Sequence, residues 1–174
     1  ISFDFICVSG AESAMPHGQG ADRPLQNGFF TMDYGCIVDG YMSDMTRTVC
    51  LGKPTDEMKR VYDTVLRAHL AVMDGIHAGM TGKEADSIAR DIINKAGYEG
   101  CFGHSLGHGV GLEIHEKPNA SPNYAAVLKK GEIITVEPGI YIAGKFGVRI
   151  EDFVILTENG CDNLTKCAKN IIYL

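Results

Sequence analysis

Acidic residues interrupt apolar, strand-like segments at four places in this sequence. Asp33 and Asp44 lie on the two arms of one β-like region, and Glu137 and Glu151 each interrupt a later apolar run. An ionised carboxylate is costly to bury unless it is paired or bound to a cation. Each acid alone fits an exposed edge strand or bulge equally well. Four such interruptions in neighbouring strands favour a shared site.

A glycine-rich segment, residues 103–116, contains three histidines: His104, His108 and His115. Its glycines disfavour a helix, so the spacing of His104 and His108 is not the helical zinc-protease motif. Four carboxylates and one imidazole form an oxygen-rich ligand set for two divalent ions, which suits Mn, Fe, Co or Zn better than soft metals. Two such ions clamp a substrate oxygen and generate hydroxide near neutral pH, which is hydrolytic chemistry.

The strands that must position these residues are predicted from alternating and β-branched runs. Residues 3–9 form a first strand, and residues 29–51 form a hairpin whose Asp39-Gly40 turn has the type I′ signature. Two later strands cover residues 133–142 and 148–156, and they contain Glu137 and Glu151.

Two helices are predicted between the hairpin and the later strands. Thr55 caps the first helix, which ends at Gly79. Thr81 forms a capping box with Glu84 for the second helix, which ends at Gly97. The first helix carries an apolar stripe of Val61, Val65, Leu66, Leu70, Val72 and Met73, and two histidines interpreted as structural, His69 and His77. A hairpin, two helices and then several strands form an α+β order.

The length of 174 residues suits one domain with a real core. Lys and Arg number 16 against 22 Asp and Glu, giving a formal net charge of −6, and 45% of the residues are apolar. This composition excludes disordered and fibrous classes. The acidic balance, with scattered Lys and Arg, argues against a nucleic-acid partner. No apolar run reaches the roughly 18 residues that span a bilayer, so no membrane partner is expected.

The six cysteines contain no C-x-x-C pair and are interpreted as structural thiols in a reducing compartment. Cys36 and Cys50, which flank the hairpin, are expected to be buried. The first residues lack the basic region of a signal peptide. We therefore expect a cytoplasmic protein.

These residues, in this order, resemble the pita-bread metallopeptidases, namely methionine aminopeptidase, Xaa-Pro aminopeptidase and prolidase. The motifs that carry the resemblance are Met-Pro-His17-Gly, Met-Asp33-Tyr-Gly, Ser-Asp44-Met-Thr-Arg47-Thr, Gly-His104-Ser-Leu-Gly-His108-Gly, Ile-His115-Glu, Val-Glu137-Pro-Gly and Arg149-Ile-Glu151-Asp. The resemblance implies an α+β pita-bread fold, a curved antiparallel sheet covered by helices. It further implies that residues 1–174 are a catalytic domain truncated on its N-terminal side, without the family's N-terminal domain and first helices. Such a sheet would expose an apolar face for a partner chain.

The resemblance also implies a metal-binding role for five residues. Asp33 would chelate one ion, and His108 and Glu137 would bind the other. Asp44 and Glu151 would bridge two divalent ions per chain, with manganese favoured and cobalt, zinc or iron as alternatives. Glu137 would in addition move protons to and from the hydroxide that bridges the ions.

Three histidines are implied to be catalytic and substrate-binding residues: His17, His104 and His115. Imidazole suits this work because it can donate or accept a proton near neutral pH. The Tyr41-x-x-Asp44-x-Thr-Arg-Thr motif and the histidine trio resemble the Xaa-Pro branch. That branch implies cleavage between an N-terminal residue and proline, a peptide substrate with proline at the second position, and a homo-oligomer.

Other functions stay open at this point. A methionine aminopeptidase has the same ligand set and would differ in its preferred peptide. A non-enzymatic pita-bread relative would use the cavity or the surface to bind a peptide or a protein, and a creatinase-like hydrolase would work without metal. The complete ligand set disfavours the last two classes.

Overall fold

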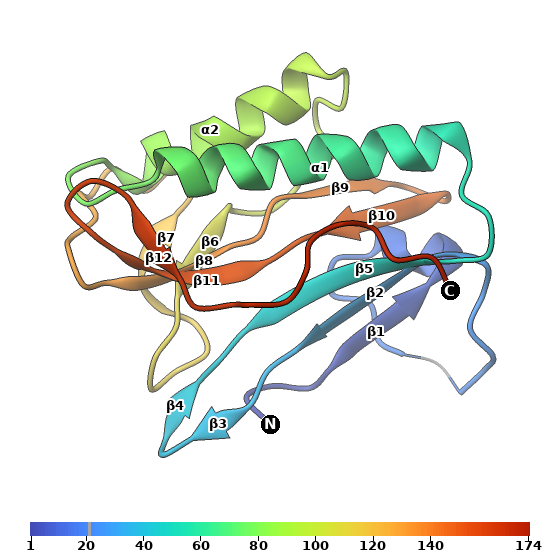
Figure 1. The fold of residues 1–174 in the computed structure, drawn as a ribbon, viewed down its shortest axis with the longest axis horizontal. Coiled ribbons are helices and arrows are strands. Elements are labelled where there is room, and N and C mark those ends of the chain that lie inside the picture. Colours follow the sequence, from blue (N-terminus) through green and yellow to red (C-terminus); the bar gives the residue numbers. More distant parts are fainter. Residues whose placement is uncertain (21) are drawn as a thin grey trace.

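Two helices lie side by side over one face of the strands in the computed structural model, which describes residues 1–20 and 22–174 (Figure 1). The helices are α1 (Asp56–Gly75) and α2 (Gly82–Lys95), and a short 3-10 helix spans Gly10–Ala14. The strands are β1 (Ile6–Ser9), β2 (Gly28–Tyr34), β3 (Ile37–Val38), β4 (Tyr41–Met42), β5 (Met45–Leu51), β6 (Gly107–Gly109), β7 (Glu116–Ala120), β8 (Ile133–Val136), β9 (Gly139–Ile142), β10 (Phe146–Arg149), β11 (Asp152–Leu156) and β12 (Cys161–Asn163). The predicted α+β order is confirmed.

The strands form two larger antiparallel sheets and two short hairpins. One sheet has the order β1-β2-β5, and the other has the order β12-β11-β8-β6-β7. Strands β9 and β10 pair with each other, and so do β3 and β4. The loops where strands pass from one sheet to another carry several of the predicted site residues.

The hairpin turn was predicted correctly. Both central residues have positive φ, 51° at Asp39 and 87° at Gly40, as a type I′ turn requires. Val38 pairs with Tyr41 across this turn, and Asp33 of β2 lies opposite Thr46 of β5. The register therefore brings the two arms of the hairpin together next to Asp44.

Both predicted helix starts are confirmed. The Thr55 side chain accepts a hydrogen bond from the backbone N–H of Met58, and Thr81 and Glu84 form the complete capping box of α2. The predicted end of the first helix was wrong, because α1 stops at Gly75 rather than Gly79. The residues that follow bond to distant segments of the chain instead: Ala78 N donates to Thr157 O and Gly79 N donates to Leu128 O, each at 2.9 Å.

The two long strands predicted near the C-terminus are each broken in two. Pro138 has no N–H to donate, and β8 ends before Glu137-Pro138. The second break falls between Arg149 and Asp152, where the chain passes from the β9–β10 pair to β11. Both breaks coincide with acidic residues, so Glu137 and Glu151 lie at bends rather than within ladders.

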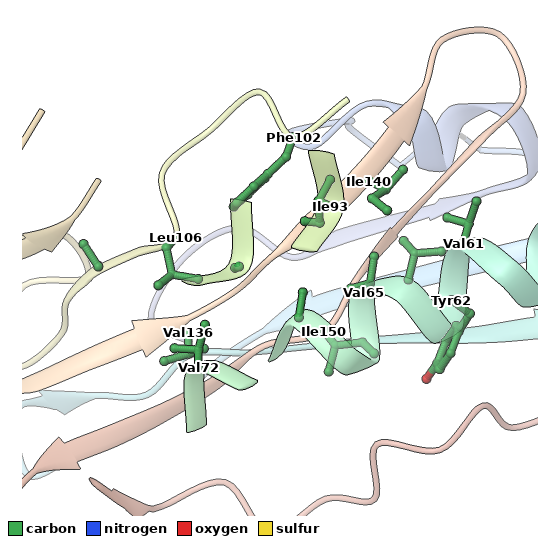
Figure 2. Packing of buried hydrophobic residues seen from close by; sticks show 14 of the residues in the cluster. Val61, Tyr62, Val65, Val72, Ile93, Phe102, Leu106, Val136, Ile140 and Ile150 are labelled. Carbon is green, nitrogen blue, oxygen red and sulfur yellow. The ribbon is translucent and has the colours of Figure 1, made fainter. Parts of the chain in front are cut away.

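The core lies between the helices and the sheets (Figure 2). Val61, Val65 and Val72 of α1 are fully buried against apolar side chains such as Ile93 and Ile150. Each such side chain contributes about 1.5–3 kcal/mol through removal of its surface from water. One residue of the predicted stripe does not belong to it, since Leu70 is 45% exposed.

The cysteines are free thiols throughout the described part of the chain. Cys50 is buried as expected, but the expectation for Cys36 was wrong, because Cys36 is exposed beside the hairpin. Among residues 1–20 and 22–174, no helix is long and apolar enough to cross a membrane.

Candidate metal centre and cavity

A cavity of about 350 Å³ opens between the two larger sheets. All eight predicted site residues line it: His17, Asp33, Asp44, His104, His108, His115, Glu137 and Glu151. They come from both halves of the described chain, on either side of the two helices. The fold thus brings together residues that are more than a hundred positions apart.

Three of the four acids of the cavity are buried, and Glu137 is half-buried. Asp33 is 8% exposed, Asp44 is 5% exposed and Glu151 is 1% exposed. The alternative of exposed edge strands is therefore excluded for these residues. Clustered acids at such depth require protons or cations to compensate their charge.

Three residues converge on one point. Asp44, His108 and Glu151 each offer a ligand atom, and these atoms lie within 4.8 Å of one another. His108 Nε2 lies 3.7 Å from Asp44 Oδ2 and 3.4 Å from Glu137 Oε1. The other ring nitrogen, Nδ1, lies 3.0 Å from Gly109 O. This second bond orients the ring so that Nε2 faces the carboxylates.

Burial and clustering shift the pKa values of several groups in the cavity. Burial raises the pKa of Asp44 to about 8, and the nearby charges of Asp33 and Glu137 add to the effect. Burial also raises the pKa of Glu137 to about 7 and that of Glu151 well above its usual range. In contrast, burial lowers the pKa of His108 to about 4, so its ring is neutral at pH 7 and able to bind a metal ion.

The donor set fits divalent cations. Within the described residues, Asp33 Oδ1 and Asp44 Oδ1 are buried and have no hydrogen-bond partner. Buried polar atoms are normally satisfied. Oxygen and imidazole ligands suit Mn, Fe, Co or Zn.

Arg149 balances part of this negative charge. Its Nη2 donates a hydrogen bond to Asp33 Oδ2, and its Nε donates to Thr46 Oγ1 at 3.0 Å. Thr46 Oγ1 in turn donates to Glu151 Oε2 at 2.5 Å. These contacts orient Asp33 and Glu151 from the side of β5 and β10.

The three remaining histidines surround the acids. His104 Nε2 lies 2.9 Å from the Tyr141 hydroxyl, and burial, with the charge of Arg149 adding to the effect, lowers the pKa of His104 to about 4. The rings of His108 and His115 meet edge to face, with centroids 4.3 Å apart. His17 and His115 are exposed at the cavity mouth, where a ligand can reach them.

Sequence reasoning assigned no role to Arg149, Thr46 or Tyr141. The Tyr141 hydroxyl accepts a hydrogen bond from Arg149 Nη1 at 3.0 Å, and the ring lies against Gly139 and Gly147. A Cβ at Gly139 would lie 2.6 Å from the Tyr141 hydroxyl oxygen, and a Cβ at Gly147 would lie 2.7 Å from Cδ1 of the ring. Two glycines in neighbouring strands around one tyrosine were the signal that could have identified it.

Comparison with known proteins assigns a family to this arrangement. The model of metallopeptidase family M24 matches residues 1–158. This chain belongs to metallopeptidase family M24. The resemblance to pita-bread metallopeptidases is confirmed, and the M24 chain has their fold.

Individual relatives agree with this assignment. The M24 chain is 48% identical over 172 residues to the Xaa-Pro dipeptidase of Pyrococcus furiosus, with 98% of this chain and 49% of the relative covered. The solved Xaa-Pro dipeptidase of Bacillus anthracis superposes with a TM-score of 0.98 at 49% identity, covering 99% of this chain and 49% of that one. The X-Pro aminopeptidase of Thermotoga maritima MSB8 superposes with a TM-score of 0.96 at 45% identity, covering 99% and 49%. The M24 chain therefore spans about half the length of these relatives.

Proposed function

We propose that the M24 chain, residues 1–174, is the catalytic domain of a metal-dependent peptidase that cleaves the bond between an N-terminal residue and proline. The observation that carries this proposal is the convergence of Asp44, His108 and Glu151 inside a cavity ringed by histidines. The relatives named Xaa-Pro dipeptidase and X-Pro aminopeptidase support the choice of substrate.

Five residues would hold two divalent ions, with manganese favoured. Asp33 would bind one ion, His108 and Glu137 the other, and Asp44 and Glu151 both. The burial of Asp33, Asp44 and Glu151 supports this set. The raised pKa values of Asp44, Glu137 and Glu151 support it as well, because cations would replace the bound protons. When bound, such ions activate water and polarise a carbonyl oxygen.

Glu137 would transfer the proton. Its Oε1 accepts a hydrogen bond from Thr135 Oγ1 at 3.2 Å, which orients the carboxylate. Glu137 would accept a proton as water attacks the carbonyl carbon. It would then return the proton to the proline nitrogen as the carbon–nitrogen bond breaks. A pKa of about 7 before metal binding suits a group that accepts and returns protons near neutral pH.

The histidines would hold the peptide. His115 and His17 at the cavity mouth would donate hydrogen bonds to the carbonyl oxygen as negative charge develops on it. His104, neutral and fixed by Tyr141, would contact the substrate deeper in the cavity. Imidazole suits these roles because its ring nitrogens can donate or accept a hydrogen bond.

We further propose that the protein forms a homo-oligomer in the cytoplasm. An apolar recess of about 380 Å³ is lined by Phe5, Tyr34, Met45 and Phe153 near the N-terminus, and a partner chain would cover such a surface. The free thiols fit a reducing compartment.

The decisive experiment compares peptides with proline and with alanine at the second position. In the presence of Mn²⁺, we expect hydrolysis of Xaa-Pro peptides and loss of that hydrolysis in Asp44→Ala and Glu151→Ala. Turnover retained in either variant would refute the metal-dependent mechanism. Preference for Met-Ala over Xaa-Pro peptides would indicate a methionine aminopeptidase, and no hydrolysis of any peptide would indicate a non-enzymatic relative.

A further inference from the structure

A buried arginine lies beside Glu151 without lining the cavity. Arg47 is 8% exposed, and its Nη1 donates to Thr46 O at 2.9 Å and to Glu151 O at 2.5 Å. Its Nη2 donates to Asp152 Oδ1 at 2.6 Å. Successive side chains of a strand point to opposite faces. Thr46 therefore contacts the Glu151 carboxylate from one face, while Arg47 donates to the backbone carbonyl of Glu151 from the other face.

This arginine links two strands that do not pair with each other. In the described sheets β5 pairs with β2, while β11 pairs with β8 and β12. The direct backbone bond at this point runs from Glu151 N to Thr46 O at 3.1 Å. Arg47 reinforces it, so that both the N–H and the carbonyl of Glu151 are held against β5.

The C-terminal segment completes the arrangement. Arg47 Nε donates to Ala168 O at 2.9 Å and Nη2 donates to Cys167 O at 3.0 Å. Lys169 Nζ lies 2.8 Å from Asp152 Oδ2. Figure 1 shows this segment, in dark red, passing alongside β5 on its way to the C-terminus. Every N–H group of the Arg47 guanidinium thereby donates to a backbone carbonyl or to the Asp152 carboxylate.

We propose that Arg47 and Asp152 form a positioning clamp that fixes the backbone of Glu151 so that its carboxylate is held ready to bind metal. The inference rests on the proposed function, because it treats Glu151 as a metal ligand. Neither clamp residue lines the cavity. Only arginine can serve here, since lysine is a single point charge that cannot reach four carbonyls and a carboxylate together.

A half-buried arginine offers a matched control. Arg90 binds both Asp86 oxygens, at 2.6 and 2.8 Å, and donates to Phe102 O at 2.7 Å and His104 O at 2.8 Å. It makes the same kinds of hydrogen bond as Arg47, but it holds the loop before His104 instead of the bend that contains Glu151. Substitution of either arginine should destabilise the fold, whereas only substitution of Arg47 should weaken metal binding.

The experiment titrates Mn²⁺ calorimetrically into the chelator-stripped intact protein and its R47K, D152N and R90K variants. Mutation of a residue that hydrogen-bonds to a metal ligand typically lowers metal affinity by about 10–100-fold. We expect R47K and D152N to weaken Mn²⁺ binding by about tenfold or more, and the R47K/D152N double variant to be no weaker than R47K. We expect R90K to lower the melting temperature and leave Mn²⁺ affinity within about twofold.

Three results would overturn the clamp. Wild-type Mn²⁺ affinity in a folded R47K or D152N protein would show that Glu151 needs no such support. An equal loss in R90K would show general loosening of the fold instead of positioning. If R47K does not fold, the Mn²⁺ affinity of D152N tests the proposal instead, because this substitution keeps the shape of the side chain and removes its charge. Absence of Mn²⁺ binding in the unaltered protein would refute the proposed function itself, and the clamp with it.

Discussion

Replacement of Asp44 by asparagine should stabilise the metal-free protein at neutral pH while it abolishes metal binding. Asp44 is almost fully buried beside other acids, and the pKa of its carboxyl is raised from 3.8 to about 8. The folded metal-free protein therefore resists ionisation of this group. Asparagine has nearly the same shape and carries no charge to bury.

The size of the effect follows from the linkage between protonation and folding. Because the pKa of Asp44 is higher in the folded state, its contribution to stability is fully present below pH 3.8 and is lost as the pH rises toward 8. Each pH unit in this window changes the free energy of unfolding by at most about 1.36 kcal/mol. Between pH 5 and pH 7 the D44N variant should gain about 2 kcal/mol relative to the unaltered protein.

The assay is urea unfolding followed by circular dichroism in the presence of a chelator, at pH 5, 6 and 7. Asp39→Asn is the matched control, since Asp39 occupies an exposed turn where asparagine also tolerates a positive φ. Its effect on the free energy of unfolding should be the same at each pH. A pH-independent difference between D44N and the unaltered protein would refute the reasoning, and so would a difference that shrinks from pH 5 to pH 7.

Three further substitutions test other parts of the site and fold. Glu137→Gln should lower kcat about a thousand-fold at saturating Mn²⁺, because the proton carrier is lost; near-normal kcat in steady-state assays would exclude that role. His115→Ala should lower kcat by about a hundred-fold through loss of a donor to the developing oxyanion, and an effect on KM alone would instead indicate ground-state binding. Thr81→Ala should remove the capping box of α2 and lower the free energy of unfolding by about 1 kcal/mol, with kcat unchanged; unaltered stability in thermal melts would contradict it.

Local signals in the sequence predicted local structure well. The Asp39-Gly40 turn and the Thr55 and Thr81 caps depend on residues within a few positions of each other, and all three are present in the structure. The acids of the cavity were also identifiable, because a carboxylate inside an apolar strand is unusual anywhere in a sequence. Their convergence on one cavity is what the fold adds.

The features that the sequence did not reveal depend on distant partners. The end of α1 at Gly75 reflects hydrogen bonds from the following residues to Thr157 and Leu128. The roles of Arg47 and Arg149 arise from partners more than a hundred positions away, such as Glu151 and Asp33. No periodicity or spacing within either segment encodes such pairs. The exposure of Cys36 likewise reflects the position of the hairpin at the rim of the molecule.

The central claim is that the buried carboxylates and His108 form one metal centre. The most direct test is the number of Mn²⁺ ions bound per folded chain, measured by calorimetric titration of the chelator-stripped protein, with Asp44→Ala as the comparison. The account predicts about two ions per chain, and loss of both in the variant. A folded protein that binds no Mn²⁺, or an Asp44→Ala variant that binds as many ions as the unaltered protein, would contradict it.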